Sequence, residues 1–93
     1  MDQYEGLAHL EWWANRLTCL GAFRVRVLVT AIGTDWLASA DFVEPLSAEV
    51  HEGWSLLTRL SPYFTLRFEA DESAVIDVRV DRSENDRLTL SAA

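Results

Sequence analysis

Lysine is absent from this 93-residue sequence, and all eight of its basic side chains are arginine. A lysine Schiff base, a phosphate-loop lysine and a lysine general base are therefore excluded. Cysteine occurs once, at Cys19, so the chain cannot form an internal disulfide, and this usage fits a reducing compartment. We interpret Cys19 as an inert packing residue, because it lies near the expected end of a helix, where the helix dipole disfavours a thiolate.

Long hydrophobic runs are also missing. The longest apolar stretch, FRVRVLVTAI at residues 23–32, is interrupted by arginines and is far shorter than the roughly 20 residues that span a bilayer. The amino-terminal segment, MDQYEGLAHL, is acidic and lacks the basic flank and the continuous apolar stretch of a signal peptide. We therefore expect a cytoplasmic protein that makes no contact with a membrane.

The charge balance is strongly acidic, with fifteen Asp and Glu residues against eight arginines and a net charge of −7. This balance disfavours direct binding to nucleic acid, which requires cations at the phosphates. A basic protein partner suits the charge better, although acidity also serves solubility alone. The apolar content of 49% in a chain of this length predicts a single domain over residues 1–93.

Apolar residues recur at steps of three and four between residues 2 and 20, a pattern typical of an amphipathic helix. The expected buried stripe comprises Leu7, Leu10, Trp13, Ala14, Leu17 and Leu20. Asp2 is expected to cap this helix and Gly21 to end it. At about 100° per residue, Trp13 falls on the stripe and Trp12 nearly opposite. The sequence therefore predicts that Trp13 is in the core and Trp12 on the surface.

The rest of the chain carries two pairs of strand patterns, with a helical pattern between the pairs. Alternation of apolar residues predicts one hairpin of strands at 23–32 and 36–43, and another of strands at 63–70 and 74–81. Between them, Ser47 is expected to cap a helix over about residues 48–60. The expected buried side of this helix comprises Val50, Trp54, Leu57 and Leu60. Residues 87–90 are expected either to add a short edge strand or to fray.

These elements predict an α+β fold of order α-β-β-α-β-β. In this two-layer sandwich, two helices cover one face of an antiparallel sheet. The other face is expected to carry charges of both signs, on Arg24, Arg26, Thr65, Arg67, Glu69, Asp77, Arg79 and Asp81 with one hydroxyl among them. Cross-strand ion pairs on a solvated face explain this mixture. No aromatic side chains stand between these arginines to stack on bases, which disfavours a nucleic-acid interface.

Glu5 and His9 are four residues apart, a spacing at which a carboxylate and an imidazole on one helix face can share a metal ion or a proton. A metal site needs further ligands, and His51 lies on a different predicted helix. A solvated pair on a helix flank explains the spacing better. Glycine-rich nucleotide loops, HExxH and GxSxG are absent. We expect no metal, no cofactor and no catalytic residues, and an enzyme using Glu5, His9 and His51 is the least favoured alternative.

Exposed aromatic side chains among charged neighbours are typical of protein interfaces. The predicted interface comprises Trp12, Tyr4, Glu5, Glu11 and Arg16, unless the chain termini or the turn at 83–86 cover Trp12. The leading hypothesis is a non-catalytic inhibitor or immunity-type protein that blocks a basic partner, such as a nuclease toxin or a nucleic-acid-binding complex. The alternative is a small homodimeric accessory domain, in which Trp12 and the edge strand meet their symmetry mates.

Overall fold

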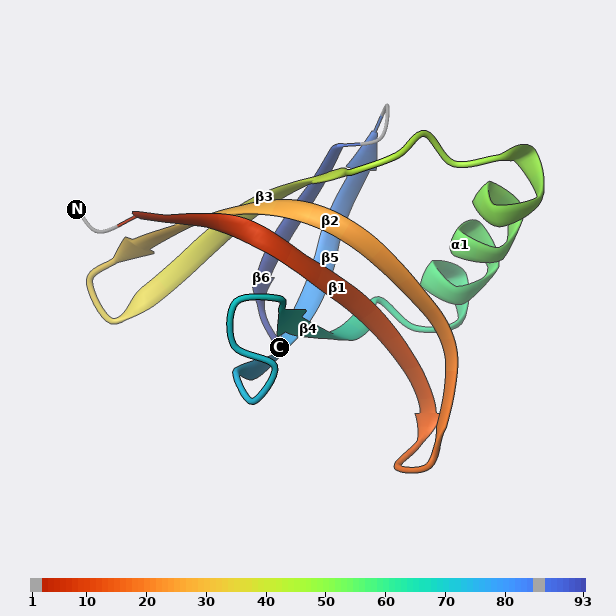
Figure 1. The fold of residues 1–93 in the computed structure, drawn as a ribbon, viewed down its shortest axis with the longest axis horizontal. Helices are drawn as coiled ribbons and strands as arrows, with labels where there is room; N and C mark the ends of the chain where they lie inside the picture. The colour runs from red at the N-terminus through yellow and green to blue at the C-terminus, as the bar shows by residue number, and fades with distance from the viewer. Residues whose placement is uncertain (1–2, 85–86) are drawn as a thin grey trace.

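The computed structural model describes residues 3–84 and 87–93, which form six strands and one helix. The strands are β1 (Gln3–Asn15), β2 (Thr18–Ile32), β3 (Asp35–Phe42), β4 (Tyr63–Phe68), β5 (Val75–Glu84) and β6 (Arg87–Ala92), and the helix is α1 (Ala48–Leu60). All neighbouring strands are antiparallel, and the order β1-β2-β3-β6-β5-β4 closes into a barrel. Two three-stranded meanders, joined through α1, thus close on each other by the pairing of β1 with β4 and of β3 with β6 (Figure 1).

The predicted α+β sandwich with two helices on one face is wrong, because the segment predicted as its first helix forms β1 and the beginning of β2. Side chains in β1 alternate, so that Ala8 and Leu10 are fully buried while Glu5 points outward and is exposed. Pairing with β2 on one side and β4 on the other satisfies the β1 backbone within the barrel. This tertiary pairing outweighs the helical spacing of the apolar residues. The predicted cap, Asp2, lies outside the described residues.

The assignment of the adjacent tryptophans is also reversed. Trp12 packs against the core, and its indole Nε1 donates a hydrogen bond to the carbonyl of Ser61 at 3.2 Å. Trp13 is 38% exposed on the outer surface, where its Nε1 donates to Glu11 at 3.3 Å. Neighbouring side chains point to opposite faces of a strand, so the two indoles cannot share one environment.

Both predicted hairpins are confirmed. The first has a two-residue turn at Gly33 and Thr34, and Gly33 has a φ of +61°, which tight hairpin turns require at their first central position. The inward faces of both hairpins are apolar and alternate along each strand, and the buried residues on them are Phe23, Val25, Val27, Ala38, Ala40, Phe64, Leu66 and Val78. Residues 87–92 form the strand β6, as one of the two expectations has it. This strand pairs with β3 on one side and β5 on the other, so it is not at an edge.

The helix α1 begins and ends at the predicted residues. Ser47 caps it, with its hydroxyl accepting a hydrogen bond from the Val50 amide at 3.2 Å. Trp54 and Leu57 are buried as predicted, whereas Val50 and Leu60 are exposed. No helix in the described part of the chain has the length and apolar character needed to cross a membrane.

Trp54 closes one end of the barrel. Its ring packs against Phe23 of β2, Phe42 of β3 and Phe64 of β4, with centroids 4.9–5.1 Å apart. Its Nε1 donates to the Ser83 hydroxyl of β5 at 3.3 Å. One helical side chain therefore contacts four strands, and the helix is held against the end of the barrel and not against a sheet face.

The reversal of the tryptophans predicts unequal effects on stability. Trp12→Ala should lower the free energy of unfolding by about 3 kcal/mol, the lower end of the range for truncated core aromatics, because packing and the bond to Ser61 are both lost. Trp13→Ala should cost under about 1 kcal/mol, as exposed positions do. Urea denaturation of both variants measures the difference. Equal destabilisation would contradict the orientation of β1.

Candidate protein-binding site

Part of β2 lacks a neighbouring strand on one side. The strand covers Thr18–Ile32, but β3 pairs only with its residues 25–32, and none of the described strands pairs with residues 18–23 on that side. The last backbone contact is the hydrogen bond from the Val43 amide to the Arg24 carbonyl, at 3.1 Å. Backbone groups of alternate residues in a strand point to the same side, so the amide and carbonyl of Ala22 also face this free edge.

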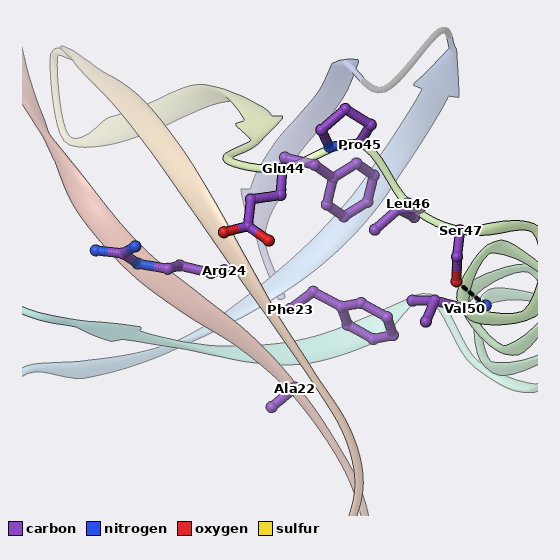
Figure 2. Close-up of a pocket in the computed structure, with 9 residues that line it drawn as sticks. Ala22, Phe23, Arg24, Glu44, Pro45, Leu46, Ser47 and Val50 are labelled. Atoms are coloured by element: carbon purple, nitrogen blue, oxygen red, sulfur yellow. Dashed lines mark hydrogen bonds between the residues drawn. The ribbon is translucent and has the colours of Figure 1, made fainter.

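A groove lies beside the free edge. After Val43 the chain leaves β2, and residues 44–47 lead to α1, which opens a hollow of about 360 Å³ between this connector and β2 (Figure 2). Its lining comprises Ala22, Phe23, Arg24, Phe42, Glu44, Pro45, Leu46, Ser47 and Val50. Phe23, Leu46 and Val50 point into it from the strand, the connector and the helix (Figure 2). The groove therefore combines a free sheet edge with an apolar floor.

Two charged side chains line the groove, Arg24 and Glu44, and only Arg24 forms an ion pair within the described part of the chain. The Arg24 guanidinium donates two hydrogen bonds to the Glu69 carboxylate, at 2.6 and 3.1 Å. These bonds lower the pKa of Glu69 and raise the pKa of Arg24. Glu44 forms no ion pair within the described part of the chain. The acidic side chain is thus the one available to a bound molecule.

The tip of the β1–β2 hairpin is the second part of the site. We call residues 13–20 the arm; the hairpin curves across the barrel and its turn extends past the other strands (Figure 1). The Asn15 side chain accepts a hydrogen bond from the Leu17 amide at 2.8 Å and so shapes the turn. Leu17 is 92% and Leu20 57% exposed, and Arg16 is the only charged residue of the arm. Two exposed leucines on a projecting hairpin make the arm a candidate binding surface.

The base of the arm is anchored against α1. Trp12 donates to the carbonyl of Ser61, directly after the helix. Gly21 lies under Leu57, and a Cβ at this position would be 2.7 Å from the Leu57 Cδ1 atom. Because Gly21 has no side chain, the strand can lie close to the helix at this point, and only the tip of the arm projects.

The five residues of the predicted interface do not form one surface. Tyr4 lies near the opposite end of β1 from the arm, where its ring packs edge-on against Phe68 at 5.4 Å. Glu5 is exposed on the outer face, and Trp12 is largely covered. Glu11 forms an ion pair with Arg67 at 3.3 Å. Of the five, only Arg16 lies on the exposed tip of the arm.

The residues weighed for catalysis or metal binding are also dispersed. His9 contacts Glu69, with its Nε2 atom 3.1 Å from the carboxylate, and not Glu5. His51 is exposed on α1. Within residues 3–84 and 87–93, no cluster of three or more potential metal ligands is found. Cys19, interpreted as a packing residue, is exposed on the arm instead.

The predicted ion pairs on the outer surface are present in part. Arg24 pairs with Glu69 across β1, and Arg79 pairs with Asp81 in the same strand at 2.6 Å.

The arm and the groove are not predicted from the sequence, because the helical spacing places Leu17 and Leu20 in the core of a helix. One available signal was Asn15, a turn-forming residue between two segments that can each be read as a strand.

The Arg24–Glu69 pair predicts a defined pH dependence. Glu69→Gln should reduce stability at about pH 7, and the difference from the parent should shrink as the pH falls below the ordinary glutamate pKa of about 4.3 and vanish below the lowered folded pKa, because the carboxylate loses its bonds to Arg24 when it is protonated. Urea denaturation at several pH values checks this. Both proteins should carry His9→Gln, so that the imidazole beside Glu69 does not contribute. A difference that persists unchanged in acid would show that the pair is not the cause.

Comparison of the chain with protein-family models, with curated proteins and with solved structures finds no match. The features that can indicate a function are therefore structural, namely the free edge of β2, the groove beside it and the projecting arm. These three features are contiguous along one strand, since residues 18–20 belong to the arm and residues 22–24 line the groove.

Proposed function

We propose that this chain is a non-catalytic protein-binding domain that takes up an extended segment of its partner along the free edge of β2. The observation that carries the proposal is the mismatch between β2 and β3, which leaves residues 18–23 without a second neighbour beside an apolar groove. A strand added there gains backbone hydrogen bonds from the edge, while side-chain pockets provide specificity.

The composition of the edge supports strand addition. Residues 17–23 contain no charged residue and no proline. Natural proteins usually protect a free edge with such residues, because an exposed edge pairs readily with other chains. The β1–β2 register shifts between Trp12 and Trp13, but it is regular from Gly21 onward. Addition of a strand is therefore most favourable at residues 22–24, next to the groove.

The chemistry of the groove defines the segment that fits. Its apolar floor favours a partner side chain such as leucine, and Glu44 at its margin favours a neighbouring arginine or lysine. Glu49 in the first turn of α1 adds a carboxylate beside Val50, which lines the groove, and the net charge of −7 attracts a basic partner. An inhibitor or immunity-type role against a basic partner is one form of this proposal.

A proline on the free edge tests the proposal. Ala22→Pro removes an amide that faces the edge but leaves the hydrogen bonds between β1 and β2 in place. It should weaken binding of the partner by about 2 kcal/mol, roughly thirtyfold in Kd. Pull-down from the native host identifies the partner, and calorimetry with the purified partner measures Kd. Thermal denaturation confirms that the variant is folded.

A matched pair of leucine variants controls for surface charge. Leu20→Glu lies on the arm and should weaken the same complex, whereas Leu28→Glu lies on the paired part of β2 and should leave Kd unchanged. If a partner is retained equally by the parent, Ala22→Pro and Leu20→Glu proteins, the free edge of β2 is not the binding site.

A further inference from the structure

We propose that the segment that occupies the β2 edge is the arm of a second copy of this chain, so that two chains pair as a symmetric dimer. This inference rests on the proposed function and names its partner. The groove favours an extended segment with an apolar residue next to a basic one. The turn of the arm presents this pair as Arg16 and Leu17, directly before the extended residues of β2, and both side chains are exposed.

Antiparallel pairing of two β2 edges places each tip at the partner's groove. In such a pair, residues that precede the centre of one strand lie opposite residues that follow the centre of the other. With the centre near Leu20, where the β1–β2 register shifts, Thr18 of one copy lies opposite Ala22 of its partner, and the turn residues Arg16 and Leu17 come beside residues 23–24. Because the contact is two-fold symmetric, each copy contributes one tip and one groove.

The contacts at each end are complementary. Leu17, which is 92% exposed in the single chain, would enter the apolar hollow formed by Phe23, Leu46 and Val50. Arg16 would approach Glu44, while Arg24, which lies opposite Arg16 in this register, is already compensated by its two hydrogen bonds to Glu69. Neither Arg16 nor Glu44 forms an ion pair within the described part of its own chain. The same contact made twice covers an apolar side chain and compensates two charges in each chain.

The distribution of acidic residues favours this surface for self-association. Two chains that each carry a charge of −7 repel one another, so a self-complementary contact requires a region without carboxylates. Residues 12–23 contain no Asp or Glu, and their single charge is the positive Arg16. At the groove, the arginine of one chain faces the glutamate of the other, which opposes the general repulsion.

Charge reversal with rescue tests the dimer by sedimentation velocity over a range of protein concentrations. The parent should be dimeric at micromolar concentration, and Arg16→Glu and Glu44→Arg should each raise the dimer dissociation constant about tenfold or more, because like charges then meet twice. The double variant, Arg16→Glu with Glu44→Arg, should recover the affinity of the parent. Arg82→Glu and Glu5→Arg change the net charge by the same amounts away from the arm and groove, and should have little effect.

Cys19 provides a second measurement. It is the only cysteine of the chain and lies next to the expected two-fold axis, so a short bismaleimide can join only two chains. Cross-linking should be efficient in the parent, weak in Arg16→Glu and restored in the double variant.

Two results would overturn the dimer: a parent that stays monomeric up to about 100 µM, where a specific self-association should be populated, or a dimer that neither charge reversal weakens. If the parent is monomeric but the Ala22→Pro variant loses a partner from the host, the dimer proposal fails and the proposed function stands. If Ala22→Pro affects neither a host partner nor the dimer, the proposed function itself fails.

Discussion

Backbone pairing between β1 and β2 is the interaction on which the rest of the molecule depends. It turns an amino-terminal segment with helical spacing into a strand, and it places Ala8 and Leu10 in the core. The same strand then pairs with β4 and closes the barrel. Because β1 follows β2 beyond the point where β3 departs, the pairing also creates the arm and exposes the β2 edge. Fold and candidate site thus have a common origin.

The helix α1 makes this extension possible. Trp54 fills the end of the barrel with aromatic contacts, and the base of the arm is tied to the helix through Trp12 and Gly21. A two-stranded ribbon alone is marginally stable in water. Supported by α1 at its base, the ribbon can present exposed leucines at its tip while its backbone geometry stays defined. The connector that leads into α1 forms the far wall of the groove, so the helix contributes to both halves of the site.

Local signals identified most of the strands and the helix correctly. Residues 23–32 alternate without ambiguity, Gly33 allows a tight turn, and Ser47 is a strong cap. The prediction of a helix in the amino-terminal segment is wrong because two periods fit this segment. Its inward residues Gly6 and Ala8 are small and give a weak alternating signal, whereas its leucines repeat at helical steps. The groove could not be predicted, because it depends on where β3 separates from β2, and tertiary pairing sets that point. Arg16 lies in the candidate site because it is in the turn of the β1–β2 hairpin, and not, as the helical spacing predicts, because it neighbours Trp12 on a helix.

The order of strands around the barrel also has a kinetic consequence. Each meander consists of local hairpins, but closure requires β1 to meet β4 and β3 to meet β6, segments from opposite halves of the chain. Such non-local pairing closes long loops before it gains contacts, which slows folding. Until closure, both meanders present open outer strands on which other nascent chains could add. A high density of negative charge opposes those encounters in the ensemble before closure, so the acidity of this chain protects its folding as well as its solubility.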